Sequence, residues 1–300
     1  SNGGEIYLNQ FLHHPLSVLP VIQQRQQALK AFIGSMEQME QMKITNGTCL
    51  IIEKFFETSF KNIPVQISLP GAYWYQFWNK ADYSLIKYSV AHLVLFVQNL
   101  MDFIHLFEKE ENNPVIETLV QKINKLLRHP DLVYLKEKQK ISSPQQILSL
   151  GHFFLYRYKN NTGSLLEYFY ELDSLYSLAK AHQTYHFQFP NWIDETQPYL
   201  AVEQAVHPLV NNAIGNDLAL SPVKNFLFLT GANMAGKSTF IKTIGIVVYL
   251  SHIGMGAPAK KITLTVMDGL ITNLNIADNV IKGESYFYNE VQRIKNTVLK

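Results

Sequence analysis

The sequence predicts a multidomain protein in which a helical part is followed by an α/β part. Apolar residues recur at helical spacing up to about residue 195, and short apolar runs separated by turns follow from Tyr199. A phosphate-binding motif at 231–239 lies in this second part. A length of 300 residues suits about two domains. We therefore expect a helical domain over 1–195 and an α/β domain over 196–300.

The helical part should consist of several amphipathic helices. A helix follows the His14-Pro15-Leu16 turn and runs to Ile33, whereas Asn46-Gly47 indicates a turn and the prolines of 63–71 indicate a connector. Apolar spacing and helix start and stop signals predict further helices over 81–109, over 115–127, from the Ser-Ser-Pro at 142–144, and along 165–179. The stretch 88–107 is the most membrane-like, but polar residues interrupt it. We interpret it as a buried helix and expect no membrane partner.

Apolar runs in the second part predict strands. They lie at 200–206, 218–220, 225–230, 262–266 and 269–274. The run at 225–230 is continuously apolar and aromatic, which is typical of a buried strand. Helical spacing after the phosphate-binding motif predicts a helix to about Ile253, and a last helix is expected from Phe287.

The most informative stretch is a complete G-x-x-x-x-G-K-S/T motif. It stands between a predicted strand and a predicted helix, the context in which such a loop wraps phosphate. Gly231 and Gly236 let the backbone approach phosphate oxygens, Lys237 would reach the β- and γ-phosphates, and Ser238 would supply a hydroxyl to Mg²⁺. The alternative is a glycine-rich turn that merely resembles the motif, and the strand–loop–helix context argues against it. The candidate binding residues are Gly231, Ala232, Asn233, Met234, Ala235, Gly236, Lys237, Ser238 and Thr239.

Composition excludes some classes of protein and leaves others open. A net charge of +2 with 17% charged residues gives no global field for holding nucleic acid. The single cysteine, Cys49, excludes a disulfide framework and a cysteine-based zinc site, which fits a reducing compartment and a cytoplasmic location. Residues 122–140 are rich in lysine and arginine. This run is either a solvated surface or a surface that contacts nucleic-acid phosphates.

An ATPase of this type also needs a carboxylate at the end of a neighbouring strand to order Mg²⁺, and a group that orients water. Val266-Met267-Asp268 is the nearest candidate after Lys237, but only two apolar residues precede its acid. Either the chain is a fragment of a longer protein, or it binds nucleotide without turnover. We favour a fragment and expect it to be inactive as an enzyme.

The phosphate-binding motif and its surroundings resemble the MutS family of DNA mismatch-repair ATPases. Residues 230–239 are similar to the family's T-G-P-N-M-G-G-K-S-T, and the Asn-Met pair separates this loop from generic ones. The family's D-x-x-x-T, A-D and G-x-S-x-F-x-x-E elements resemble Asp268–Thr272, Ala277-Asp278 and Gly283–Glu290. Upstream, 172–181 resembles a long core helix, 206–210 resembles the H-P-x-V turn, and 15–27 resembles the opening of the helical core.

This resemblance implies an all-helical core and lever domain followed by an ABC-like P-loop ATPase domain, here truncated before its Walker B strand. ATP or ADP with Mg²⁺ would be bound, and the ATPase domains would form a homodimer. Lys237 and Ser285 are the candidate catalytic residues, with Ser285 reaching the partner's nucleotide unless it is only a helix N-cap. Asn233 would lie beside the phosphates. Ile214 and Asn216 would border the adenine, where Ala213 replaces the family's usual aromatic residue.

Two functions follow from this resemblance. The first is a MutS-like, DNA-associated ATPase related to mismatch repair, whose nucleotide state drives the helical arms. The opening of the chain resembles the family's helical core and not its mismatch-reading domain, and 25–172 is short for a clamp, so only backbone contacts through 122–140 are expected. The second is an ATP-controlled dimerisation module that acts on protein partners without binding DNA. Under either function, His207 is expected to stabilise a turn and not to take part in chemistry.

Overall fold

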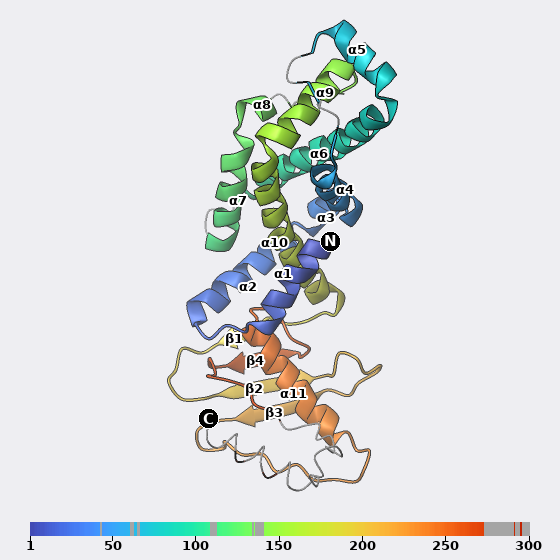
Figure 1. The fold of residues 1–300 in the computed structure, drawn as a ribbon. Coiled ribbons are helices and arrows are strands. Elements are labelled where there is room, and N and C mark those ends of the chain that lie inside the picture. Colours follow the sequence, from blue (N-terminus) through green and yellow to red (C-terminus); the bar gives the residue numbers. More distant parts are fainter. Residues whose placement is uncertain are drawn as a thin grey trace. The chain divides into compact units, whose positions relative to one another are not determined.

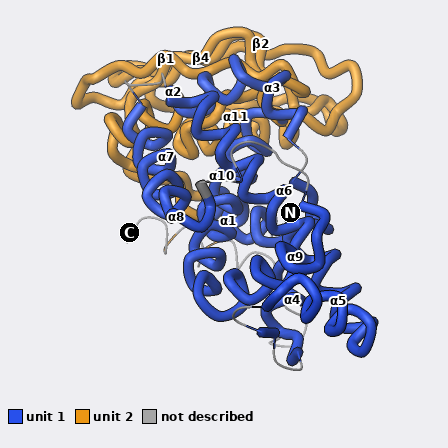
Figure 2. The backbone as a smooth tube through the Cα atoms, turned by 90° about the horizontal axis from the view of Figure 1, so that it is seen from above, with its two compact units in different colours: residues 1–13, 27–180 blue, residues 14–26, 181–300 orange. Residues whose placement is uncertain are grey.

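A computed structural model describes residues 1–42, 44–60, 63–64, 67–108, 113–133, 135, 141–272, 291 and 295. The chain forms two compact units, coloured separately in Figure 2. Unit 1 combines 1–13 with 27–180, and unit 2 combines 14–26 with 181–300. The second unit therefore contains a short segment from near the start of the chain, which no sequence pattern indicated. The predicted combination of a helical part and a part with a sheet is confirmed.

Helices make up unit 1 in the described part of the chain (Figure 1). Two of them, α2 and α10, continue into unit 2. In chain order they are α1 Asn2–His13, α2 Leu19–Gly34, α3 Met36–Glu40, α4 Asn46–Glu57, α5 Leu69–Trp78, α6 Lys80–Phe107, α7 Pro114–Leu127, α8 Pro130–Val133, α9 Pro144–His152, the π-helical turn η2 Phe153–Arg157, and α10 Lys159–Thr184.

Side-chain caps explain where several of these helices begin. Asn113 Oδ1 accepts from the N–H groups of Val115 and Ile116, both at 3.2 Å, at the start of α7. The Ser143 hydroxyl accepts from Gln146 N at 3.2 Å, which confirms the helix start predicted at 142–144. Each cap satisfies N–H groups that lack a partner within the helix.

Two predictions for the helical part are wrong. The Asn46-Gly47 turn is the first turn of α4, because the Thr45 hydroxyl caps the helix by accepting from Thr48 N at 3.3 Å. The connector predicted over 63–71 ends early, because α5 begins at Leu69 with Pro70 in its first turn. Proline is well tolerated at that position, since the N–H that it lacks would have no partner there.

The core of unit 1 surrounds α6, which packs against α4, α7 and α9. Leu93, Phe96 and Val97 of α6 are fully buried, so the helix predicted over 81–109 is a core helix. Among the described residues, α6 alone is long and apolar enough to cross a membrane, and 56% of its most apolar window is buried inside the protein. A core helix of this length passes the same test, and its burial fits that role.

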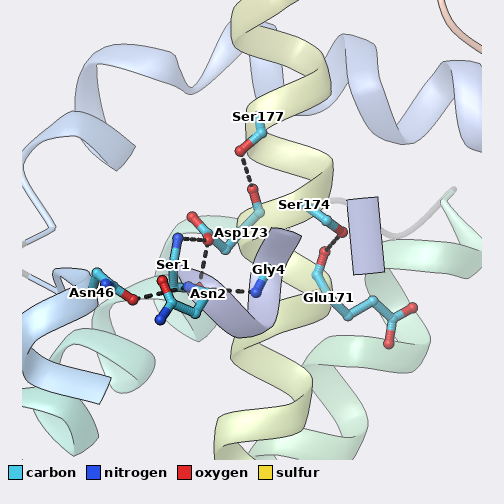
Figure 3. Close-up of polar contacts among 8 residues, drawn as sticks. All are labelled: Ser1, Asn2, Gly4, Asn46, Glu171, Asp173, Ser174 and Ser177. Carbon is cyan, nitrogen blue, oxygen red and sulfur yellow. Dashed lines mark hydrogen bonds and ion pairs between the residues drawn. The ribbon is translucent and has the colours of Figure 1, made fainter. Parts of the chain in front are cut away.

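Helix α1 crosses α10 closely, as Figure 3 shows. The Ser1 ammonium and hydroxyl donate to Asp173 Oδ2 at 2.6 and 2.7 Å, and Gly4 N donates to Ser1 Oγ at 3.1 Å. A side chain at Gly3 would collide with the ring of Tyr170, because an added Cβ would lie 2.2 Å from its Cδ2. Glycine therefore permits this close crossing.

Unit 2 contains a sheet of four strands with the order β1-β4-β2-β3 (Figure 1). The strands are β1 Asn191–Trp192, β2 Leu200–Ala205, β3 Asn216–Leu220 and β4 Lys261–Leu264. Among the described strands only the pair β1–β4 is parallel; β2 pairs antiparallel with both β4 and β3. Helix α11, Lys237–His252, lies across the sheet, and its Val247 and Val248 share a buried cluster with Leu200, Val202 and Ile262.

The structure confirms three predicted strands and contradicts two. Runs 200–206, 218–220 and 262–266 correspond to β2, β3 and β4. Run 225–230 is not a strand, because no ladder of hydrogen bonds joins it to the sheet; Phe226 and Phe228 are each 80% exposed. The described part of the run 269–274, up to Thr272, is not a strand either. Of the last predicted helix only Val291 and Lys295 are described, and both are helical.

The segment 14–26 is fixed to the C-terminal end of α11 within unit 2. Leu16 N donates to His252 O at 2.7 Å, and His252 Nδ1 lies 2.8 Å from Leu16 O. Arg25 Nη1 donates to Ile253 O at 3.0 Å, just beyond the last turn of α11. A cation at this position satisfies a carbonyl group and interacts favourably with the negative end of the helix dipole.

Candidate nucleotide-binding site

The loop 231–236 turns the chain into the first residue of α11. Gly236 is the N-cap and has left-handed backbone angles, with φ 83° and ψ 10°. Gly231 has φ 155°, and Met234 has φ 65°. Glycine adopts such angles without the Cβ penalty that other residues suffer, so Gly231 and Gly236 are needed for this shape. Met234 is the exception, and its side chain is fully exposed.

Lys237 lies over the loop that precedes it. Its Nζ donates to the carbonyl oxygens of Gly231 at 2.7 Å and Ala232 at 2.6 Å. No acidic residue stands in the first turn of α11, so the positive end of the helix dipole is not neutralised there. The N-terminal end of the helix and the ammonium group together favour an anion at this loop.

An open cavity of about 700 Å³ lies beside the loop. Two separate predicted segments meet in its wall: the adenine segment, with Ala213, Ile214 and Asn216, and the phosphate loop, with Ala235, Gly236, Lys237 and Thr239. A cavity of this size falls within the range typical of small-molecule sites. The structure thus brings together residues that are more than ten positions apart in sequence.

The remaining predicted residues of the loop lie outside the cavity wall. Gly231, Ala232, Asn233, Met234 and Ser238 are exposed and do not line it. Ser238 follows Lys237 in the first turn of α11, where its exposed hydroxyl is accessible to a metal ion. Among the described residues no group of three His, Cys, Asp or Glu side chains is placed to hold a metal ion. A cation here would therefore depend on the hydroxyl and on phosphate oxygens.

The adenine segment is held against β2. Gln204 has φ 52° at an irregularity in the pairing of β2 with β3, and its N–H and side-chain amide donate to Asp217 Oδ1 at 2.7 and 3.1 Å. Gly215 passes so close to Gln204 that an added Cβ would lie 2.9 Å from the Gln204 Cα. Asn216 Nδ2 donates to Ile214 O at 3.0 Å, which closes the segment on itself.

Several wall residues were not identified from the sequence. Asp217 places a carboxylate in the wall, and Leu227, Leu229, Phe240 and Thr243 supply further side chains. The hydrogen bonds of Asp217 to Gln204 depend on the pairing of β2 with β3, which the sequence does not specify. Thr243 was hidden inside the amphipathic pattern of α11, where its hydroxyl donates to Thr239 O at 2.8 Å.

His207 lines the same cavity but also stabilises a turn. Its Nδ1 accepts from Leu209 N at 3.3 Å, and its carbonyl oxygen accepts from Val210 N at 3.0 Å. With Nδ1 as the acceptor, the neutral ring carries its proton on Nε2. These contacts support the turn role that was expected from the sequence.

The candidate acid Asp268 does not lie at the phosphate loop. It lines a separate cavity of about 130 Å³ with Val248, Tyr249 and His252, at the C-terminal end of α11. A helix of 16 residues is about 24 Å long, so Asp268 and Lys237 stand at opposite ends of α11. Ser285 and the Ala277-Asp278 pair lie outside the described residues.

The chain is similar to known proteins in its C-terminal part. The family model that matches, over residues 227–300, is described as MutS domain V. The DNA mismatch repair protein MutS of Petrotoga mobilis is 32% identical over 134 residues, which is 43% of this chain and 16% of that protein. The protein of the same name from Geobacillus sp. is 31% identical over 142 residues, which is 45% of this chain and 16% of that protein. The chain thus spans about a sixth of the length of these relatives.

Proposed function

Because the chain belongs to the MutS family, we propose that it binds ATP or ADP with Mg²⁺ in the cavity beside Lys237. The observation that carries this proposal is the meeting of the phosphate loop and the adenine segment in one cavity wall. Lys237 would give up its bonds to the loop carbonyls and donate to phosphate oxygens, since an anion is the stronger acceptor. Ser238 would then supply its hydroxyl to Mg²⁺.

Replacing Lys237 tests this proposal directly. Lys237→Ala leaves phosphate charge uncompensated, so MgADP affinity should fall by about 2–3 kcal/mol, or roughly 30- to 150-fold. Lys242→Ala is the matched control, because Lys242 stands on the same helix but does not line the cavity. Titration calorimetry of the three proteins measures the effect. Equal affinity in wild type and Lys237→Ala would refute the assignment of the loop.

We propose further that the whole protein is a DNA-associated ATPase related to mismatch repair, located in the cytoplasm. Both relatives carry the name of a DNA mismatch repair protein, and α7 presents a basic surface that supports a DNA contact. Lys122, Lys125 and Arg128 of this surface are all exposed. They follow one another at intervals of three residues, so they lie along one side of the helix and its C-cap.

Duplex binding measured across a salt series tests the DNA contact. Phosphate contacts give a loss of affinity that is linear in the logarithm of salt concentration. Lys122→Glu with Lys125→Glu should reduce that slope by about two, whereas Lys87→Glu, an exposed cation of α6, should not. A protein that binds no duplex at any salt concentration would instead be a nucleotide-controlled module that acts on protein partners.

Dimerisation through the ATPase domain is the remaining part of the proposal, and it rests on the resemblance of Gly283–Glu290 to the family's G-x-S-x-F-x-x-E element. Ser285 would contact the nucleotide of the second subunit, so that the γ-phosphate favours the closed dimer. The whole protein should then dimerise more tightly with a non-hydrolysable ATP analogue than with ADP in sedimentation. Ser285→Ala should remove this difference and leave ADP binding unchanged. Loss of ADP binding in that variant would place Ser285 in its own subunit's site.

A further inference from the structure

Helix α5 carries its large apolar side chains on the face that points away from unit 1. Figures 1 and 2 both show α5 at one end of that unit. Its outward side chains are between 53% and 67% exposed: Leu69, Tyr73, Trp74, Phe77 and Trp78. A surface helix normally buries its apolar stripe and exposes its polar side. Here Ala72 is the buried residue, and Gln76 is half-buried.

Three of the exposed rings, those of Trp74, Phe77 and Trp78, form one cluster, which we call the aromatic face. The rings of Trp74 and Trp78 stack with centroids 6.0 Å apart and an interplanar angle of 22°. Phe77 meets Trp78 edge-on at 5.6 Å. Because aromatic side chains bury large areas, a contiguous cluster of this kind marks an interaction surface more than a single exposed ring does.

The inward side of α5 is firmly held, so the aromatic face is a fixed feature of unit 1. The helix packs against α6 and α9, and the Ser68 hydroxyl caps it by accepting from Gly71 N at 3.3 Å. Gln145 Nε2 of α9 donates to Ile67 O at 2.9 Å, just before the helix. Burial on this side raises the pKa of Tyr75, and the nearby carboxylate of Asp82 raises it further.

Charge on and beside the aromatic face points to the kind of partner. No charged residue occurs between Ser68 and Asn79. A cation stands at its edge, because Lys80 Nζ lies 5.5 Å from the centroid of the Phe77 ring. A typical protein interface carries about ten direct hydrogen bonds, and side chains of the aromatic face offer few groups for such bonds. Tryptophan and tyrosine beside lysine are instead typical of segments that lie in the headgroup region of a bilayer.

We propose that α5 is a docking surface for a lipid bilayer with anionic headgroups. The helix would lie in the plane of the interface, with Trp74, Phe77 and Trp78 among the acyl chains and Lys80 beside phosphate groups. A deformable apolar medium can cover a protruding helix without a matching groove. The sequence predicts no membrane-spanning helix, and on that ground no membrane partner was expected. A helix that lies on the surface of a bilayer does not need to span it. The inference does not depend on nucleotide binding.

The tryptophans of the chain permit a direct test. The sequence contains three, and Trp192 of unit 2 is the one outside α5. In a Trp192→Phe background, all tryptophan emission comes from Trp74 and Trp78. Phosphatidylcholine vesicles that contain phosphatidylglycerol should shift this emission to the blue and co-sediment with the protein. Lys80→Glu should weaken the dependence on phosphatidylglycerol.

Two paired variants separate the aromatic face from exposed aromatic residues in general. Trp74→Ser with Trp78→Ser, in the wild-type chain, should lower the vesicle-bound fraction at least tenfold. Phe226→Ser with Phe228→Ser is the matched control, because it removes two exposed rings from unit 2, and binding should be retained. Circular dichroism checks that both variants fold, which we expect because these four side chains are exposed.

Three results would overturn the proposal. The first is absence of vesicle binding by the wild-type chain, and the second is equal binding by the Trp74→Ser, Trp78→Ser variant. The third is a concentration-dependent dimer without lipid that this variant abolishes, which would assign the aromatic face to a second copy of the chain. Quenching of Trp74 and Trp78 by a single-stranded oligonucleotide, with no response to vesicles, would assign it to base stacking.

Discussion

Replacing Gly215 by alanine should distort the adenine side of the candidate nucleotide site. A Cβ at this position would lie 2.5 Å from Gln204 Oε1 and 2.9 Å from Gln204 Cα, whereas ordinary contacts begin at 3.4 Å. The side-chain oxygen can move away, but the Cα is held on both sides, because Glu203 pairs with Lys261 of β4 and Ala205 pairs with Asn216 of β3. The segment 213–216 must therefore move by about half an ångström or more.

The size of the effect follows from this contact. Overpacking against a backbone atom costs about 1–3 kcal/mol, and Gly215 is not in a helix, so no gain in helix propensity offsets it. For a unit of this size each kcal/mol lowers the unfolding midpoint by about 3–6 °C. Ile214 and Asn216 move with the segment and line the cavity, so MgADP affinity should fall by about 1 kcal/mol, roughly fivefold.

Gly245→Ala provides the matched control. Gly245 lies inside α11, and an added Cβ meets no atom within 4 Å, so this substitution should stabilise unit 2 by about 0.5–1 kcal/mol. Scanning calorimetry with and without MgADP measures both variants, and the transition that rises with ligand is that of unit 2. If both variants shift the unfolding midpoint equally and in the same direction, the argument from the close contact at Gly215 is refuted. A lower midpoint with unchanged ADP affinity would show that 213–216 does not border the nucleotide.

Two further predictions concern unit 1. Gly151→Ala should lower the free energy of unfolding by up to about 2 kcal/mol in a urea titration, because the new Cβ would lie 2.7 Å from Cγ2 of the buried Ile86 and the gain in helix propensity within α9 offsets only part of this overpacking. Gly163→Ala, with no atom within 4 Å, should raise it by about 0.5–1 kcal/mol. Burial raises the pKa of Cys49 from 9.0 to about 12, so between these pH values the folded chain keeps a proton that the unfolded chain has lost. Stability should therefore fall as pH rises from 9 to 12, by up to about 1.4 kcal/mol per pH unit from this group. Urea titrations across this range should show a shallower fall for Cys49→Ala, and equal slopes would contradict the raised pKa.

The elements that the sequence predicted best are those fixed by local chemistry. Helix α6 follows from an apolar stripe of seven turns, and its bounds differ from the predicted 81–109 by one or two residues. The start of α9 follows from Ser143 and Pro144, whose cap and ring both suit a first turn. The turn into α11 is equally local, because Gly231 and Gly236 supply its positive φ angles.

The features that the sequence did not predict depend on contacts between distant residues. The segment 14–26 belongs to unit 2 because Leu16 and Arg25 meet the end of α11, more than 200 positions away. The carboxylate of Asp217 lies in the cavity wall and accepts from Gln204 because β2 pairs with β3. In sequence, neither the segment 14–26 nor the residues around Asp217 differ from an ordinary surface segment.

The run 225–230 shows why a strand pattern and a strand are different things. Leu227 and Leu229 line the cavity, although Leu227 is 44% exposed, whereas the alternating Phe226 and Phe228 are each 80% exposed. An extended backbone produces a period of two of this kind, but the sequence predicted a buried strand, and that prediction is wrong. A strand also needs a neighbour to accept and donate its backbone hydrogen bonds, and the described sheet offers none to this run. Apolar patterning reports the conformation that a segment prefers, and ladder formation depends on the presence of a second segment at its side.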